Sequence, residues 1–191
     1  LYVSPSLQIG FAAMTLAGSP FSSEKQIAEL VLAHLLSTGA LWEDIRMKGG
    51  AYGAFAQSDG IEGAFSLSTY RDPNPHRSLG VFKSALENLA RRGIDEDSLE
   101  KAVIGTYARE TRPRTNAEKG IVDFSRFLYG IDDAKRARRR KFLIKIRADQ
   151  IAAAADSLLS GAGASYPVIL AGPGTKEQAV QGDITVKHLP V

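Results

Sequence analysis

The chain has 191 residues, a formal net charge of +3 and a hydrophobic fraction of 44%, values typical of a globular protein with one substantial core. It has no cysteine, so disulfides and thiolate metal sites are excluded, and its apolar runs are too short to span a bilayer. Without cysteine or a signal peptide, we expect a cytoplasmic or other reducing compartment and no membrane partner.

The first third of the chain is predicted to pass from strand to helix. Gln8–Leu16 is short and apolar, which indicates a buried strand. Ser23 and Gln26 form a capping-box pattern at the start of a helix. That helix carries a core-facing stripe of Ile27, Leu30, Val31 and Leu35. We expect an interruption at Thr38-Gly39, a resumed helix through Leu41–Ile45, and a stop at Gly49.

A hairpin follows, and then a mostly helical stretch. Ala51–Ser58 and Gly63–Tyr70 are predicted strands around the turn pair Asp59-Gly60. Five helices are expected after them. The first carries an apolar stripe from Leu79 to Leu89 and ends at Gly93, and the second carries a stripe from Leu99 to Tyr107 and ends before Pro113. The third begins with a capping box of Thr115 and Glu118, ahead of Ile121, Phe124 and Leu128. The last two begin near Asp132 and Asp149.

The C-terminal stretch is predicted to return to strand. Tyr166–Ala171 and Ile184–Leu189 are apolar or alternating, with a turn at Gly172-Pro173-Gly174 into a short helix between them. The economical architecture is α+β: a mixed, mostly antiparallel sheet of about five or six strands with helices packed on one face. We expect residues 1–191 to form a single αβ domain, cut from a larger multidomain protein.

The usual catalytic and cofactor motifs are missing. His34, His76 and His188 are not spaced as metal ligands, and His34 lies on an apolar helix stripe, where a core or half-buried role is favoured. There is no Gly-x-Ser-x-Gly elbow, and Gly172-x-Gly174 lacks the rest of a phosphate-loop pattern. We therefore predict no metal and no cofactor on this chain.

The densest charge cluster is the basic run Lys135–Lys141. One interpretation is a nucleic-acid-binding surface, since clustered arginines neutralise phosphates. A solvated helix, with Asp132 pairing with Arg136 one turn later, is favoured because no aromatic residue interleaves the run. A wall that attracts acidic parts of a peptide is a third interpretation.

The most informative segment is Arg46-Met47-Lys48-Gly49-Gly50-Ala51-Tyr52-Gly53. A permanent cation precedes a phenol by six residues, with little side-chain bulk between them. Such a pair suits gripping a peptide main chain or an oxyanion. An ordinary helix C-terminus, where a cation and two glycines are common, explains the segment about as well.

This segment, continued by Phe65–Asn74, resembles the C-terminal domain of pitrilysin/insulinase-type zinc metallopeptidases, in the presequence protease and falcilysin branch. Element order and type match over nearly the whole chain, while the specific motifs are confined to Arg46–Asn74. The resemblance implies the metallopeptidase αβ-roll of the LuxS/MPP type. It also implies a clam-shell chamber of two halves that degrades unstructured peptides.

By match of motif, the resemblance implies that Arg46 and Tyr52 are the catalytic residues of this half. Around them, Gly49, Gly50, Ala51 and Gly53 would let an extended substrate backbone come close. The zinc ion and its ligands are expected in an N-terminal half, the partner of this domain, so the isolated chain is expected to be inactive. An inert scaffold or interaction domain of the same fold is the alternative, and a nucleic-acid-binding module is less favoured.

Overall fold

The computed structural model describes residues 1–21, 23–161, 165, 167–173, 185 and 187–188. Within them the chain forms one six-stranded sheet, six α-helices and one π-helix, η1. The strands are β1 (Tyr2–Val3), β2 (Phe11–Ala17), β3 (Gly53–Asp59), β4 (Ala64–Tyr70), β5 (Val168–Ala171) and β6 (Lys187–His188). The helices are α1 (Glu24–Thr38), η1 (Trp42–Met47), α2 (Pro75–Arg92), α3 (Glu96–Thr111), α4 (Asn116–Leu128), α5 (Asp133–Ile144) and α6 (Ala148–Ser160).

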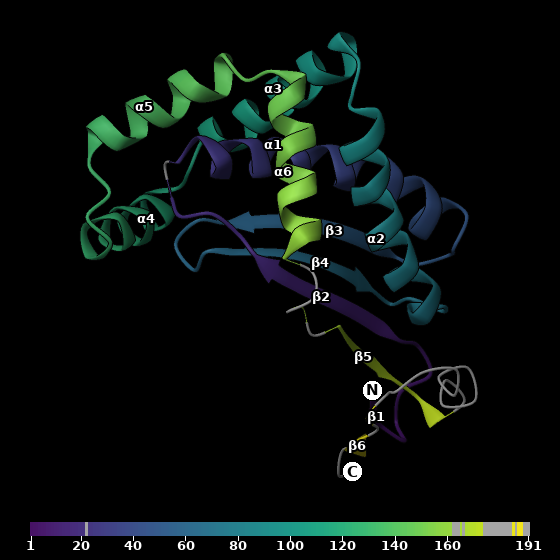
Figure 1. The fold of residues 1–191 in the computed structure, drawn as a ribbon. Helices are drawn as coiled ribbons and strands as arrows, with labels where there is room; N and C mark the ends of the chain where they lie inside the picture. Colours follow the sequence, from purple (N-terminus) through teal and green to yellow (C-terminus); the bar gives the residue numbers. More distant parts are fainter. Residues whose placement is uncertain (22, 162–164, 166, 174–184, 186, 189–191) are drawn as a thin grey trace.

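The sheet has the strand order β3-β4-β2-β5-β1-β6. Antiparallel pairs join β3 to β4, β4 to β2 and β2 to β5, and β1 runs parallel to both β5 and β6. The helices lie on one face of the sheet, and β3 is an outer strand (Figure 1). The predicted α+β class, with a mixed and mostly antiparallel sheet, is confirmed.

Two strands differ from the prediction. Tyr2–Val3 was not predicted, because a two-residue strand carries no periodic pattern and exists only through its neighbours β5 and β6. At the other end, the described part of Ile184–Leu189 that pairs is Lys187–His188. The rest of that predicted strand, apart from Thr185, and the predicted short helix from Gly174 onward lie outside the described residues.

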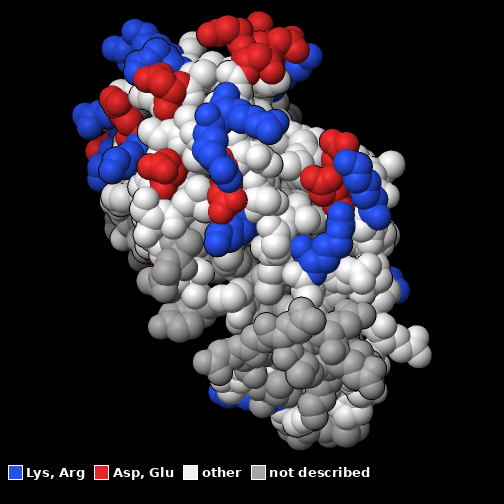
Figure 2. Space-filling model, turned by 45° about the vertical axis from the view of Figure 1, so that its right-hand side comes forward, with Lys and Arg blue, Asp and Glu red and all other residues white. Residues whose placement is uncertain are grey.

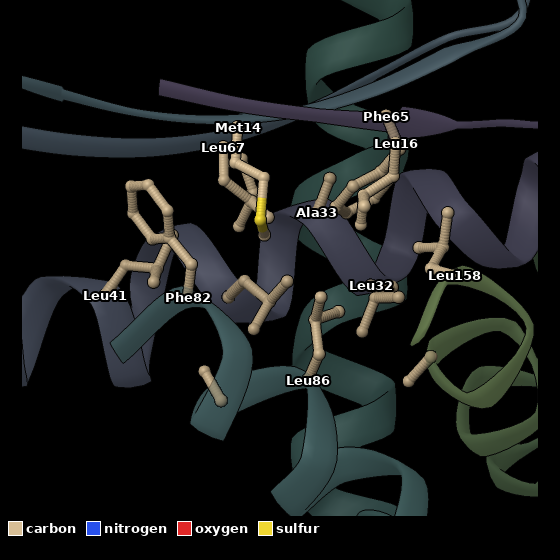
Figure 3. Close-up of a cluster of buried hydrophobic side chains, with 14 of the residues drawn as sticks. Met14, Leu16, Leu32, Ala33, Leu41, Phe65, Leu67, Phe82, Leu86 and Leu158 are labelled. Atoms are coloured by element: carbon tan, nitrogen blue, oxygen red, sulfur yellow. The ribbon is translucent and has the colours of Figure 1, made fainter. Parts of the chain in front are cut away.

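The core is sandwiched between the sheet and the helical layer. Side chains from β2 and β4 point toward α1, while α2 and α6 close the cluster from the far side (Figure 3). Its labelled members are Met14, Leu16, Leu32, Ala33, Leu41, Phe65, Leu67, Phe82, Leu86 and Leu158. Alternation along β2 and β4 sends every second residue into this cluster, which is why both strands read as half-buried.

Helix starts follow the predicted caps. The hydroxyl of Ser23 accepts a hydrogen bond from the backbone N–H of Gln26, and Thr115 and Glu118 form the complete reciprocal capping box. The predicted box at Ser23 is only half formed, since the Gln26 side chain is buried and turns to Ser58 and Arg139 instead. A buried amide needs these partners more than a helix end needs a second cap.

The hairpin connection lies one residue later than predicted. β3 continues through Asp59, and the connection runs from Gly60 to Gly63. The Asp59 carboxylate accepts hydrogen bonds from the backbone N–H groups of Ile61 and Glu62, while Gly63 adopts a positive φ of 63°. Asp59 therefore ends β3 instead of forming a turn pair with Gly60, and its side chain organises the connection.

Helix α4 departs most from expectation. Its predicted stripe of Ile121, Phe124 and Leu128 is 61–68% exposed, and no residue of α4 is buried. The helix lies beyond the β3–β4 turn, beside α5 and away from the sheet (Figure 1). Elsewhere on the helical layer, basic and acidic side chains are interspersed, as on an ordinary solvated surface (Figure 2).

Candidate functional site

The segment that carries Arg46 is a π-helix. α1 ends at Thr38, as the interruption at Thr38-Gly39 predicted, and the resumed helix widens into η1. The backbone N–H of Lys48 donates to the carbonyl of Glu43, five residues back, at 2.9 Å. Such wide turns are rare and recur at functional sites. Sequence pattern predicted a helix here but not its type.

The chain leaves η1 through a tight turn that needs both glycines. Gly50 has φ of 79°, a conformation that favours glycine. A Cβ on Gly49 would lie 2.5 Å from the Ile45 carbonyl oxygen and 2.9 Å from the Arg77 guanidinium. Arg77 in turn donates to the Asp44 carbonyl at 2.8 Å, which ties α2 to the end of η1. The turn fixes where Arg46 and Tyr52 emerge.

Arg46 and Tyr52 are brought together on open surface. The Arg46 guanidinium carbon lies 4.1 Å from the centroid of the Trp42 ring and 6.0 Å from that of Tyr52. The Arg46 side chain makes no hydrogen bond or ion pair with any other described residue, and Tyr52 is 67% exposed. An uncompensated guanidinium beside a free phenol can bind a carbonyl or carboxylate oxygen.

Aromatic rings extend the site across the sheet. The rings of Tyr52 and Tyr70 meet edge to face at 5.8 Å between centroids, and Tyr70 meets Phe11 at 5.7 Å. Of these rings, sequence reasoning predicted Tyr52, gave Tyr70 no role of its own, and missed Phe11 and Trp42. Trp42 could have been found from its position four residues before Arg46, whereas Phe11 joins only through the pairing of β2 with β4.

The predicted backbone-contact residues have structural roles of their own. Gly49 and Gly50 form the turn, and Ala51 is buried at 4% exposure, with its N–H donating to the Ile45 carbonyl. A Cβ on Gly53 would meet the Phe55 ring at 2.6 Å, so that ring lies against the glycine. Their contact with a peptide stays a prediction.

Beyond the rings, β2 and β4 form a floor of short side chains on the sheet face that carries no helices, flanked by Phe55 of β3 and Val168 of β5. On β2 it presents Ala13, Thr15 and Ala17, and on β4 it presents Ala64, Ser66 and Ser68. These residues pair across the two strands, and the hydroxyls of Thr15 and Ser66 lie 3.2 Å apart. The floor therefore begins at the aromatic rings, and its side chains on β2 and β4 remain short as far as the β3–β4 turn.

Metal-binding geometry is not found in the part of the chain that the structure describes. No three side chains of histidine, aspartate or glutamate within it gather closely enough to hold an ion. His34 is half-buried, as predicted, and the pKa of its imidazole is lowered by burial and by the nearby charge of Arg109. These side chains do not fit a zinc site. No described helix is long and apolar enough to cross a bilayer.

The basic run is partly built into the fold. Arg139 is buried, with its guanidinium donating to Glu110 at 3.0 Å and also to Gln26, and it lies over the Phe21 ring. The predicted pairing of Asp132 with Arg136 is wrong. Asp132 caps α5 through the N–H of Lys135, and Arg136 pairs with Asp133 at 2.7 Å. The Asp132 carboxylate reaches the unpaired backbone N–H at the start of α5 more easily than the Arg136 guanidinium, so it forms the cap instead of the ion pair.

Comparison with known proteins gives consistent matches over most of the chain. A family model described as the PreP C-terminal domain matches residues 10–170. The chain is 33% identical over 171 residues to the mitochondrial presequence protease of Schizosaccharomyces pombe, covering 90% of this chain and 17% of that protein. It is 32% identical over 130 residues to presequence protease 1, chloroplastic/mitochondrial, of Arabidopsis thaliana, covering 67% of this chain and 12% of that protein. The chain thus spans less than a fifth of these relatives.

A solved structure shares the fold. The peptidase M16 inactive domain from Pseudomonas fluorescens superposes with a TM-score of 0.70 at 17% identity, covering 99% of this chain and 44% of that one.

The relatives also correct the expected compartment. They are named for mitochondria and chloroplasts, so the inference to a cytoplasmic location is wrong. Cysteine content reports whether a fold uses disulfides, and it does not report which membrane a protein has crossed.

Proposed function

Because the chain belongs to the family of PreP C-terminal domains, we propose that it is the substrate-holding domain, without a metal of its own, of a larger zinc metalloendopeptidase. The resemblance predicted from Arg46–Asn74 is confirmed by the family match and by relatives that are presequence proteases. In this proposal the zinc ion and its ligands belong to an N-terminal half. Unstructured peptides are the substrates, enclosed in a chamber between the two halves.

The observation that carries the proposal is the pairing of Arg46 with Tyr52. Both groups are exposed, and no carboxylate among the described residues neutralises the guanidinium. They sit on a rigid base of the π-helix, the glycine turn and the first residue of β3. Exposed charged groups usually pair with an opposite charge or extend into solvent, so a guanidinium held over the Trp42 ring and beside a phenol indicates preorganisation for a ligand.

Each residue has a distinct role in this proposal. The Tyr52 hydroxyl donates a hydrogen bond to the oxygen of a scissile carbonyl as negative charge develops there. Arg46 donates to a neighbouring peptide carbonyl or carboxylate and orients the chain. Trp42 holds the guanidinium in place from beneath. Since these groups only bind and polarise, the isolated domain should not hydrolyse peptides.

The test uses the full-length protein and an unstructured peptide. Tyr52→Phe and Arg46→Ala should each lower kcat/KM by about 10²–10³-fold, the loss typical for one oxyanion donor. Arg92→Ala is the matched control, since Arg92 is an exposed arginine at the far end of α2. Unchanged kcat/KM in both site variants would refute the roles of Arg46 and Tyr52. Hydrolysis by the isolated domain would refute the division of labour between the halves.

The alternative of an inert scaffold domain makes an opposite prediction. Substitutions at Arg46 and Tyr52 would then leave kcat unchanged, and only substitutions at contacts with the other half would matter. A nucleic-acid role is disfavoured, since Arg139 within the basic run is buried and paired with Glu110, and no aromatic residue interleaves the run.

A further inference from the structure

A second site lies at the α4–α5 end of the molecule and shares no residue with the Arg46–Tyr52 pair. A cavity of about 290 Å³ opens between the end of α3, α4 and α5, and Ile61 of the β3–β4 turn lines it as well. Among the described residues that line it, Glu110 is the one acid. The basic residues lining it are Arg114, Arg126, Arg136, Arg139 and Arg140.

Arg139 and Glu110 neutralise each other at the back of the cavity. The Arg139 guanidinium donates to the two Glu110 carboxylate oxygens at 3.0 and 3.4 Å, and it lies over the Phe21 ring at 4.6 Å. Gln26 accepts a further hydrogen bond from the same group. Arg139 is therefore fixed in the cavity wall, and every other described charged residue that lines the cavity is an arginine.

Two of the other arginines have weak partners outside the cavity. Arg126 pairs with Asp123 at 2.8 Å, and Arg136 pairs with Asp133 at 2.7 Å. The acids are 67% and 93% exposed, while the arginine side chains are 23% and 34% exposed. Ion pairs to solvated carboxylates contribute little, so both guanidiniums keep most of their attraction for an anion.

Arg114 and Arg140 have no such partner. Neither side chain forms a hydrogen bond or ion pair with another described residue, although Arg114 is only half-exposed. Four guanidiniums from α4, α5 and the loop after α3 thus line one small space. Like charges held this close repel, and an oxyanion between them would replace repulsion with charge-assisted hydrogen bonds.

We propose that this cavity binds a multivalent oxyanion, with clustered carboxylates or phosphates as its ligand class. The volume is at the lower end for ligand sites and suits two acidic side chains or one pyrophosphate. Val122 and Ile131 also line it, and their apolar surface suits the methylene groups of glutamate side chains. An acidic peptide segment is therefore the favoured source, consistent with a domain that handles peptides.

The experiment measures binding to the full-length protein of two probes, labelled tetraglutamate by fluorescence anisotropy and pyrophosphate by calorimetry. Whichever probe saturates the cavity identifies the source. The double substitution Arg114→Ala and Arg140→Ala should weaken that binding at least about tenfold. Arg138→Ala is the control, because Arg138 is an exposed arginine of α5 that does not line the cavity.

Three results would overturn the proposal. One is the absence of saturable binding of either probe. Another is equal weakening by Arg138→Ala, which would show diffuse attraction to the basic face of α5. The third is binding that survives the double substitution unchanged, which would place the probe elsewhere. Circular dichroism of each variant verifies that the fold is retained, since all three arginines are partly or fully exposed.

Discussion

The Ser37 hydroxyl oxygen lies 2.8 Å from the backbone nitrogen and 3.2 Å from the backbone oxygen of Ala56. Ala56 is in the middle of β3, an outer strand whose other side pairs with β4. One side chain from the end of α1 therefore satisfies both main-chain groups that Ala56 turns away from the sheet. An outer strand with free groups would recruit other strands, and Ser37 blocks that at this position.

Replacing Ser37 with alanine should leave the outward main-chain groups of Ala56 in β3 without a partner. The partly buried N–H and C=O of Ala56 would lose their partner, which should lower the free energy of unfolding by about 1–2 kcal/mol in urea titrations. Light scattering should show more association through β3. Ser84→Ala is the control, since that exposed hydroxyl contacts only its own helix at Val81. Identical behaviour of the two variants would refute the role of Ser37.

Replacing Gly49 with alanine should distort the turn between η1 and β3. The new Cβ would lie 2.5 Å from the Ile45 carbonyl, so backbone must shift, and a loss of about 1–3 kcal/mol in unfolding free energy is expected. Gly80→Ala in α2 meets no atom within 4 Å and should be stabilising by about 0.5–1 kcal/mol. Equal effects of the two substitutions would contradict the role of Gly49 in the turn.

Trp42 should report directly on Arg46. It is the one tryptophan of the chain, so the fluorescence of the 191-residue domain comes from this site alone. Arg46→Ala removes the guanidinium from the ring and should shift the emission to longer wavelength as water replaces it. Arg92→Ala should leave the spectrum unchanged. A spectrum insensitive to Arg46→Ala would mean that the stacking does not persist in solution.

His34 should make stability depend on pH. The pKa of its imidazole is lowered in the folded state, chiefly by burial and then by Arg109. The unfolded chain therefore binds the proton more readily, and folding stability falls as pH drops below about 6.5, the ordinary histidine value. Urea midpoints at pH 7.5 and 5.5 should differ more for the wild type than for His34→Gln. An unchanged difference would show that other groups dominate.

Local signals explain what the sequence could predict. Ser23, Thr115 and Asp132 act on backbone groups within three residues, so these helix starts were predictable from a short window. The helix stop at Gly93 is equally local, because its positive φ of 64° favours glycine. The motif around Arg46 and Tyr52 was recognisable for the same reason, since both residues belong to one continuous segment.

Contacts between distant segments explain what the sequence could not predict. The contact that ties η1 to α2, from the Arg77 guanidinium to the Asp44 carbonyl, joins residues 33 positions apart. The ring of Phe11 reaches Tyr70 only because β2 pairs with β4. The apolar stripe of α4 has the pattern of a core helix, yet it stays exposed because α4 extends past the end of the sheet. Periodicity identifies an apolar face but not what covers it.

The floor of short side chains on the open sheet face has a consequence for selectivity. Two large exposed side chains flank the floor at one end, Phe55 of β3 opposite Ser68 and Val168 of β5 opposite Ala13. Toward Ala17 and Ala64 the side chains on β2 and β4 stay short. An extended chain lying along these two strands would therefore meet large side chains at the end near Tyr70 and Phe11, and only short ones on β2 and β4 toward the β3–β4 turn.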